Sequence, residues 1–187
     1  MAIKPIETAY NGYRFRSRLE ARTAVFLDAS KIPYSYEPEG FVFEDGTAYL
    51  PDFFLPDQGT FLECKGVMGE KDENKILQLA KATGKEIVIM DPDLTPFTAI
   101  YVEDMHDYFP WKGKKPGLYT EEAALGKCYK CGRKFFFGVN GSWSCRCCGF
   151  YDGDATSEWL YWPGGYIKDY EPIKKAKRAR FEHGEAG

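Results

Sequence analysis

The feature that most constrains the fold is a pair of short cysteine motifs in the second half of the chain. Each motif reads Cys-x-x-Cys-Gly, and five of the six cysteines lie between positions 128 and 148. Four thiolates arranged in two such pairs match the ligand set of a closed, tetrahedral structural zinc site. The predicted ligands are Cys128, Cys131, Cys145 and Cys148.

The glycine after each pair decides between two neighbouring cysteines. Gly149 follows Cys148 as Gly132 follows Cys131, so Cys148 rather than Cys147 is expected to complete the second pair. A disulfide framework is not expected, because the N-terminus lacks an apolar signal segment. Since the protein would fill all four positions, the predicted zinc is structural, with an iron–sulfur centre as the main alternative.

Aromatic residues separate the two pairs, namely Phe135, Phe136, Phe137 and Trp143. They are interpreted either as the core of a small zinc module or as surfaces on which nucleic-acid bases stack. The first interpretation is preferred.

Composition limits the classes of function. The 187 residues include 44% hydrophobic ones, enough for a packed core, while a net charge of −3 lacks the basic balance of many nucleic-acid binders. Contact with nucleic acid would therefore need local patches, with solvated faces or a disordered tail as the alternative. The candidates are Arg14, Arg16, Arg18 and Arg22, and a second group of Lys174, Lys175, Lys177, Arg178 and Arg180.

No run of 18 apolar residues is present, so we expect no contact with membrane and an intracellular, cytoplasmic location. The order of predicted elements indicates an α/β fold. A helix should begin at Ser17, where Ser-x-x-Glu forms a capping box. A three-strand meander between residues 34 and 65, a helix over 73–82 and a buried strand over 87–90 should follow, with a parallel crossover to the last strand. We place a domain boundary after residue 117, which gives domains 1–117 and 118–187.

Charged residues interrupt two of the apolar strands. Asp52 lies in the predicted strand over residues 49–55 and Glu63 lies in the next strand, with Lys65 two positions further on the same face. Two carboxylates, together with the backbone carbonyl of Cys64, could hold Mg²⁺, and a lysine could position or deprotonate a water. Protection of an edge strand against aggregation is the alternative for Glu63 and Lys65.

Glu20 lies on the first predicted helix, at the margin of its apolar stripe. It is interpreted as a ligand or as a residue that orients a ligand. The capping box offers Glu20 a second role, and the two roles are compatible.

Pro51-Asp52 followed by Glu63-Cys64-Lys65, with Glu20 on an upstream helix, resembles the PD-(D/E)xK nuclease superfamily. The similarity is to small phage and mobile-element members, the junction-resolving endonuclease I type and the transposon-end endonucleases, and it covers roughly residues 14–90. It implies a restriction-endonuclease-like core, Mg²⁺- or Mn²⁺-dependent phosphodiester cleavage, and a site of Glu20, Asp52, Glu63 and Lys65. The cysteine module is not part of the shared core.

The expected function is therefore a metal-dependent DNA endonuclease acting on duplex or branched DNA. Cutting both strands often needs two active sites, which is compatible with a homodimer. An enzyme acting on RNA stays open. A different class, a non-catalytic nucleic-acid-binding or assembly protein whose function lies in the zinc module, is the main alternative.

Overall fold

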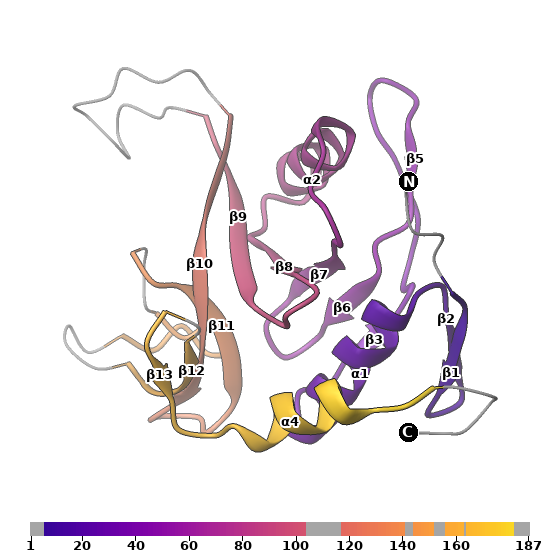
Figure 1. Cartoon of the computed structure of the whole chain (residues 1–187). Coiled ribbons are helices and arrows are strands. Elements are labelled where there is room, and N and C mark those ends of the chain that lie inside the picture. The colour runs from indigo at the N-terminus through magenta and orange to yellow at the C-terminus, as the bar shows by residue number, and fades with distance from the viewer. Residues whose placement is uncertain (1–5, 104–116, 141–143, 152–155, 163, 182–187) are drawn as a thin grey trace.

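The computed structural model describes residues 6–103, 117–140, 144–151, 156–162 and 164–181. Trp143, one of the aromatic residues between the cysteine pairs, lies outside the described residues. These residues form a mixed α/β fold with one curled, nine-stranded sheet (Figure 1). Helices α1 (Arg18–Ser30), α2 (Glu70–Thr83) and α4 (Glu171–Arg178) pack against it. The predicted α/β class is confirmed.

The strands of the large sheet follow the order β13-β12-β10-β9-β8-β7-β6-β3, with β11 beside β10. Their bounds are β3 (Ser35–Tyr36), β6 (Phe53–Leu55), β7 (Thr60–Cys64), β8 (Ile87–Met90), β9 (Pro96–Val102), β10 (Gly117–Cys128), β11 (Lys134–Gly138), β12 (Ser157–Trp162) and β13 (Tyr166–Ile167). Strands β7 and β8 are parallel, and α2 connects them. The predicted crossover is therefore confirmed.

Alternation along the strands assigns the helices to opposite faces of the sheet. Leu62 and Val88 belong to the core cluster that contains α1 and α4, whereas Phe61 and Ile87 belong to the cluster that contains α2. Successive side chains of a strand point to opposite faces, so two apolar faces arise from one run of residues. Glu63 lies on the same face as Phe61, toward α2.

The predicted strand over residues 49–55 is in fact two strands. Its first part forms β5 (Ala48–Tyr49), which pairs with β4 (Phe41–Val42) in a separate hairpin, and its second part is β6. Pro51 lies between them, and proline has no N–H to donate to a ladder. The break separates Tyr49 from Asp52 in the fold, and it lets both approach Glu63 from different directions.

Helix α1 begins as predicted. Ser17 is its N-cap, and the Ser17 hydroxyl accepts a hydrogen bond from the backbone N–H of Glu20. A small hairpin, β1 (Thr8–Tyr10) with β2 (Tyr13–Phe15), leads into the helix. Since the hairpin ends directly before Ser17, the first turn of α1 lies beside it (Figure 1).

The long strand β10 connects the two ends of the molecule. Its first half pairs with β9 and its second half with β11 and β12, so the sheet continues across the predicted boundary at residue 117. Beyond β13 the chain forms α4, whose Ile173 and Ala176 join the core around α1. None of the helices in the described part of the chain has the length and apolar character needed to cross a bilayer.

Candidate active site and metal centre

Asp52 and Glu63 face each other across neighbouring strands. Phe53 of β6 pairs with Leu62 of β7, so the preceding residue Asp52 lies opposite Glu63. Both are buried, with 6% of Asp52 and none of Glu63 exposed. Two carboxylates are thus held side by side in the interior, where an unpaired charge is costly.

Glu63 is satisfied on only one of its two oxygens. The Oε2 atom accepts hydrogen bonds from the Tyr49 hydroxyl and from Lys65 Nζ, the latter at 3.0 Å. The Oε1 atom is buried and has no hydrogen-bond partner. One carboxylate oxygen in this site is therefore available to a ligand.

Asp52 is engaged on both oxygens. Arg16 Nη2 donates to Oδ1 at 3.0 Å, and the backbone N–H of Cys64 donates to Oδ2 at 2.8 Å. The second contact ties Asp52 directly to strand β7. The predicted use of the Cys64 carbonyl as a metal ligand is not tested by these contacts and stays a prediction.

Glu20 lies at the edge of this centre, in the first turn of α1. Its carboxylate accepts hydrogen bonds from the Ser17 hydroxyl at 2.7 Å, the Arg16 backbone N–H at 3.0 Å and the Tyr36 hydroxyl at 2.7 Å. Arg16 therefore contacts Glu20 through its backbone and Asp52 through its guanidinium. Of the predicted capping box, the bond from the Glu20 N–H to the Ser17 hydroxyl is present, while the Glu20 carboxylate accepts from the Arg16 N–H rather than from that of Ser17. A ligand role for Glu20 stays a prediction.

Burial controls the protonation of the pair. It raises the pKa of Asp52 to about 7, and the neighbouring charge of Glu63 acts in the same direction while Lys65 opposes it. Burial also raises the pKa of Glu63. Since both shifts have the same sign, the site resists holding two negative charges without a cation.

The charges of Glu63 and Asp52 outweigh the effect of burial at Lys65 and raise its pKa. Lys65 therefore remains a cation at neutral pH. This favours the predicted role of positioning a water over the alternative of deprotonating one, because a general base needs a lowered pKa.

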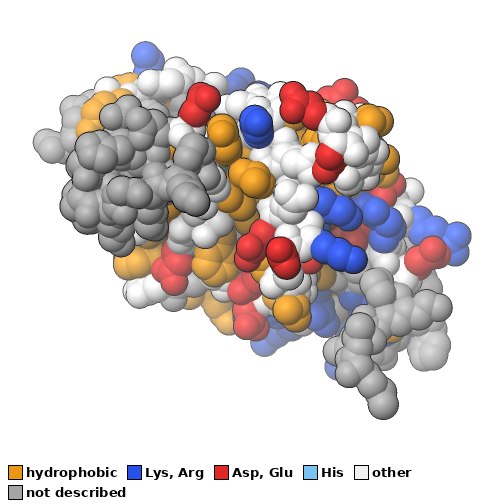
Figure 2. Space-filling model, turned by 90° about the horizontal axis from the view of Figure 1, so that it is seen from above, with side chains coloured by type: hydrophobic (Ala, Val, Ile, Leu, Met, Phe, Trp, Pro, Cys, Tyr) orange, Lys and Arg blue, Asp and Glu red, His pale blue; other side chains and the backbone are white. Residues whose placement is uncertain are grey.

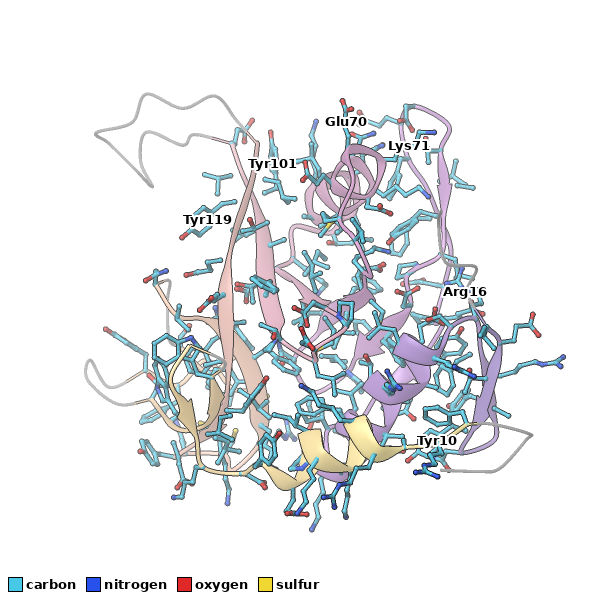
Figure 3. The ribbon with its side chains drawn as sticks, viewed as in Figure 1. Tyr10, Arg16, Glu70, Lys71, Tyr101 and Tyr119 are labelled. Carbon is cyan, nitrogen blue, oxygen red and sulfur yellow. The ribbon has the colours of Figure 1, made fainter. Side chains whose placement is uncertain are left out.

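Lys65 also lines a groove of about 1010 Å³ between α2 and the strands β8, β9 and β10. Its walls include Met68, Phe97 and Leu118, and its rim includes Glu70 and Lys71, which Figure 3 shows at the N-terminal end of α2. Figure 2 looks down on this end of the molecule, where hydrophobic, acidic and basic side chains are interspersed. The groove gives Lys65 a side open to ligands.

The four predicted cysteines form a second centre. Their sulfur atoms all lie within 4.8 Å of one another, with 3.9 Å between Cys128 and Cys148 and 3.8 Å between Cys131 and Cys145. Tetrahedral ligands at the Zn–S distance of about 2.3 Å are separated by about 3.8 Å, so the thiols fit a structural zinc. This group could hold a metal ion as predicted.

The two glycines act as the sequence indicated. Gly132 and Gly149 have φ of 72° and 69°, and their N–H groups bond to the carbonyls of Cys128 and Cys145. The tight turns bring backbone N–H groups of Cys131 and Cys147 to 3.5 and 3.4 Å from cysteine sulfurs. Cys147 is not in the cluster, and its thiol lies 3.7 Å from the Lys134 carbonyl.

Phe135, Phe136 and Phe137 are fully buried. Phe135 and Phe137 pack with Cys128 and Cys145 in the core of the cysteine module, while Phe136 joins the core around α1. Their interpretation as core residues is therefore confirmed for the described part of the module.

Two of the four candidate arginines are engaged by acids. Arg14 pairs with Glu7 at 3.3 Å, and Arg16 pairs with Glu37 at 2.7 Å as well as with Asp52. Arg18 and Arg22 line a separate hollow with residues of the C-terminal segment. The structure thus divides the patch between the carboxylate centre and another surface.

Sequence reasoning missed the tyrosines that orient the carboxylates. Tyr49 and Tyr36 donate to Glu63 and Glu20 from strands far from either residue in the chain. Both tyrosines lie in apolar strands next to turn residues, and no local sequence pattern indicates that they bind a carboxylate. Their partners follow only from the strand pairing.

Within the described residues, only the four cysteines bring three or more potential ligand atoms within 4.8 Å of one another, so the three carboxylates do not form such a set here. Comparison with protein families, curated proteins and solved structures found no match. The fold and the two centres therefore carry the functional argument alone.

Proposed function

We propose that the protein is a Mg²⁺- or Mn²⁺-dependent DNA endonuclease that hydrolyses phosphodiester bonds at the Asp52, Glu63 and Lys65 centre. The observation that carries the proposal is that the Oε1 atom of Glu63 is buried and has no hydrogen-bond partner. A second buried carboxylate, that of Asp52, and the ammonium of Lys65 lie next to Glu63. Buried acids with raised pKa values next to a groove are typical of functional sites.

The donor set fits a hard divalent cation. Mg²⁺ prefers oxygen ligands and is usually held by one or two carboxylates together with substrate phosphate and water. Glu63 Oε1 and an oxygen of Asp52 would be the carboxylate ligands, with the carbonyl of Cys64 as a third. When bound, the cation would polarise the phosphate and lower the pKa of a water.

The residues of the chain have separate tasks in this reaction. The cation of Lys65 orients the attacking water and stabilises charge on the phosphate, since its pKa keeps it protonated. Arg16 holds Asp52 in place, and Tyr49 holds Glu63. The water oxygen bonds to phosphorus and gives up a proton to solvent, the bond from phosphorus to the leaving sugar oxygen breaks, and that oxygen takes up a proton from solvent.

The order of elements supports the same proposal. Helix α1 carries Glu20. Asp52 lies directly before β6, Glu63 lies in the antiparallel strand β7, and Lys65 directly follows it. Helix α2 then leads to β8, which is parallel to β7. This order is the one expected of a restriction-endonuclease-like core. In this proposal the four cysteines hold a structural zinc, which leaves the reaction to the carboxylate centre.

Incubation of the zinc-loaded protein with plasmid, single-stranded, nicked and branched DNA tests the proposal. We expect cleavage with Mg²⁺ or Mn²⁺ and none without an added divalent cation. Lys65→Ala and Glu63→Gln should each reduce the rate by about 10²-fold or more, because each removes a group that stabilises the transition state. Lys85→Ala, an exposed lysine, is the matched control. Cleavage by Lys65→Ala at the wild-type rate would contradict the proposal.

A non-catalytic DNA-binding protein is the second candidate. The observation that favours it is the full engagement of Asp52, whose oxygens are both bonded to protein groups. Calorimetric titration with Mn²⁺ separates the two. Binding that disappears in Asp52→Asn supports the enzyme, whereas no binding together with retained DNA affinity supports the second candidate.

A further inference from the structure

Parts of the two basic patches of the sequence meet on one surface. Helices α1 and α4 lie side by side, and their cations line one hollow of about 580 Å³ (Figure 1). Its charged residues are Arg18, Arg22, Lys177, Arg178 and Arg180, and Ala179 and Phe181 complete it. We refer to it as the α1–α4 hollow.

These five cations are not neutralised within the described part of the chain. None of them takes part in an ion pair or a side-chain hydrogen bond there, and the Nε atom of Arg22 is buried without a partner. The acids of the adjoining hollow are engaged elsewhere. Asp28 accepts hydrogen bonds from Tyr10 and Asn11, and Glu171 pairs with Lys174.

Helix stability explains only some of these charges. Lys177 and Arg178 lie in the last turn of α4, where cations complement the negative end of the helix dipole. Arg18 is the first residue of α1, where the dipole is positive and disfavours a cation. Five like charges around one hollow also repel each other. An anionic ligand relieves both costs.

The hollow lies on the opposite side of α1 from the carboxylate centre. At about 100° per residue, Arg18 and Arg22 are each turned by roughly 200° from Glu20. A DNA duplex carries one charge per ~1.7 Å of its axis, so its backbone can meet several of these cations at once.

We propose that the α1–α4 hollow binds the phosphate backbone of duplex DNA. The choice of DNA as the polyanion rests on the proposed function, but the binding needs neither a divalent cation nor the carboxylates. Arginine forks match phosphate oxygens bidentately, and such contacts fix position without reading sequence.

The test measures fluorescence anisotropy of a labelled 20-base-pair duplex without added Mg²⁺, at salt concentrations from 50 to 200 mM. The test variant combines Arg18→Gln, Arg178→Gln and Arg180→Gln, all at exposed positions. The matched control removes three exposed charges elsewhere with Lys81→Gln, Lys85→Gln and Lys127→Gln. Circular dichroism and thermal melting verify that both variants fold.

We expect the test variant to bind about 10-fold or more weakly at 0.1 M salt, with a salt slope reduced by about 2–3, and the control to bind nearly as wild type. Equal loss in both variants, or wild-type affinity in the test variant, would overturn the inference. Stronger binding to anionic lipid vesicles than to DNA would also overturn it.

A cleavage assay with Mg²⁺ on the wild type and the test variant, run beside the binding assay, separates this inference from the proposed function. Wild-type binding that depends on the hollow, together with no cleavage by any form, would refute only the catalytic proposal. Cleavage by the wild type with no role for the hollow would refute only the inference.

Discussion

The four-cysteine centre and the carboxylate centre differ in how they satisfy their polar groups. Every cysteine of the first centre comes from one of two tight turns, and the four sulfurs face one another. The second centre collects Glu20, Asp52 and Glu63 from a helix and two strands, and it leaves one buried oxygen without a partner. The first is closed by its own ligands and the second is open.

In our proposal, this difference separates a structural site from a reactive one. A closed tetrahedral site has no position for substrate and contributes to folding. A buried carboxylate oxygen without a hydrogen-bond partner makes folding less favourable. Such a cost persists at sites where a bound ligand supplies the missing partner. The comparison therefore predicts opposite responses when each centre is altered.

The largest effect is expected from the closed centre. Cys145→Ser should abolish stoichiometric zinc and unfold the C-terminal module, because structural zinc contributes on the order of 10 kcal/mol in small modules. Atomic absorption gives the metal content, and tryptophan fluorescence reports on Trp159, which packs in this module.

The adjacent Cys147→Ser is the control, since Cys147 lies outside the sulfur cluster. It should retain one zinc per chain and the wild-type melting temperature. Loss of zinc from Cys147→Ser, or full zinc content in Cys145→Ser, would show that the ligand set is wrong.

Local patterns allowed the closed centre to be predicted completely. Cys148 was separated from Cys147 by the position of one glycine, and Gly149 does adopt positive φ. The N-cap at Ser17 and the parallel crossover to β8 were predictable for the same reason, since each depends on neighbouring residues or on the order of elements.

The carboxylate centre was predictable only in part. Strand order places Asp52 opposite Glu63, which the predicted meander implied. The contacts of Arg16 with Asp52 and of Tyr49 with Glu63 depend on long-range packing, and Pro51 splits a strand that the pattern made continuous. Helix α4 was not predicted either, because its short apolar face becomes visible only against α1.

A pH series sharpens the comparison at the open centre. The pKa of Asp52 is raised from 3.8 to about 7, so the folded state holds a proton that the unfolded state has lost. The associated stability is present below about pH 4 and is lost as the pH rises through about 7. The contribution of Asp52 to the fall of unfolding free energy with pH approaches about 1.4 kcal/mol per pH unit between these values. This contribution is absent in Asp52→Asn.

Urea unfolding of zinc-loaded wild type and Asp52→Asn between pH 4.5 and 7.5, without added Mg²⁺, measures this difference. The stability of the variant relative to wild type should rise with pH. A difference in stability between Asp52→Asn and wild type that does not change with pH would mean that Asp52 is charged throughout the range.

The smallest expected effects distinguish the two tyrosines within the open centre. Tyr49→Phe removes a donor from Glu63 and leaves Lys65 as the remaining donor among its hydrogen bonds, whereas Tyr36→Phe leaves Glu20 with its bonds from Ser17 and Arg16. Hydrogen bonds to charged groups contribute about 1.5–3 kcal/mol, and the cost is greater where a buried acceptor loses its compensation. Tyr49→Phe should therefore destabilise by about 2 kcal/mol and Tyr36→Phe by about 1 kcal/mol in urea unfolding. An equal loss of stability in both variants would mean that Glu63, with its unpartnered oxygen, is no more sensitive to the loss of a donor than Glu20 is. The contrast between a closed and an open site would then lose its energetic basis.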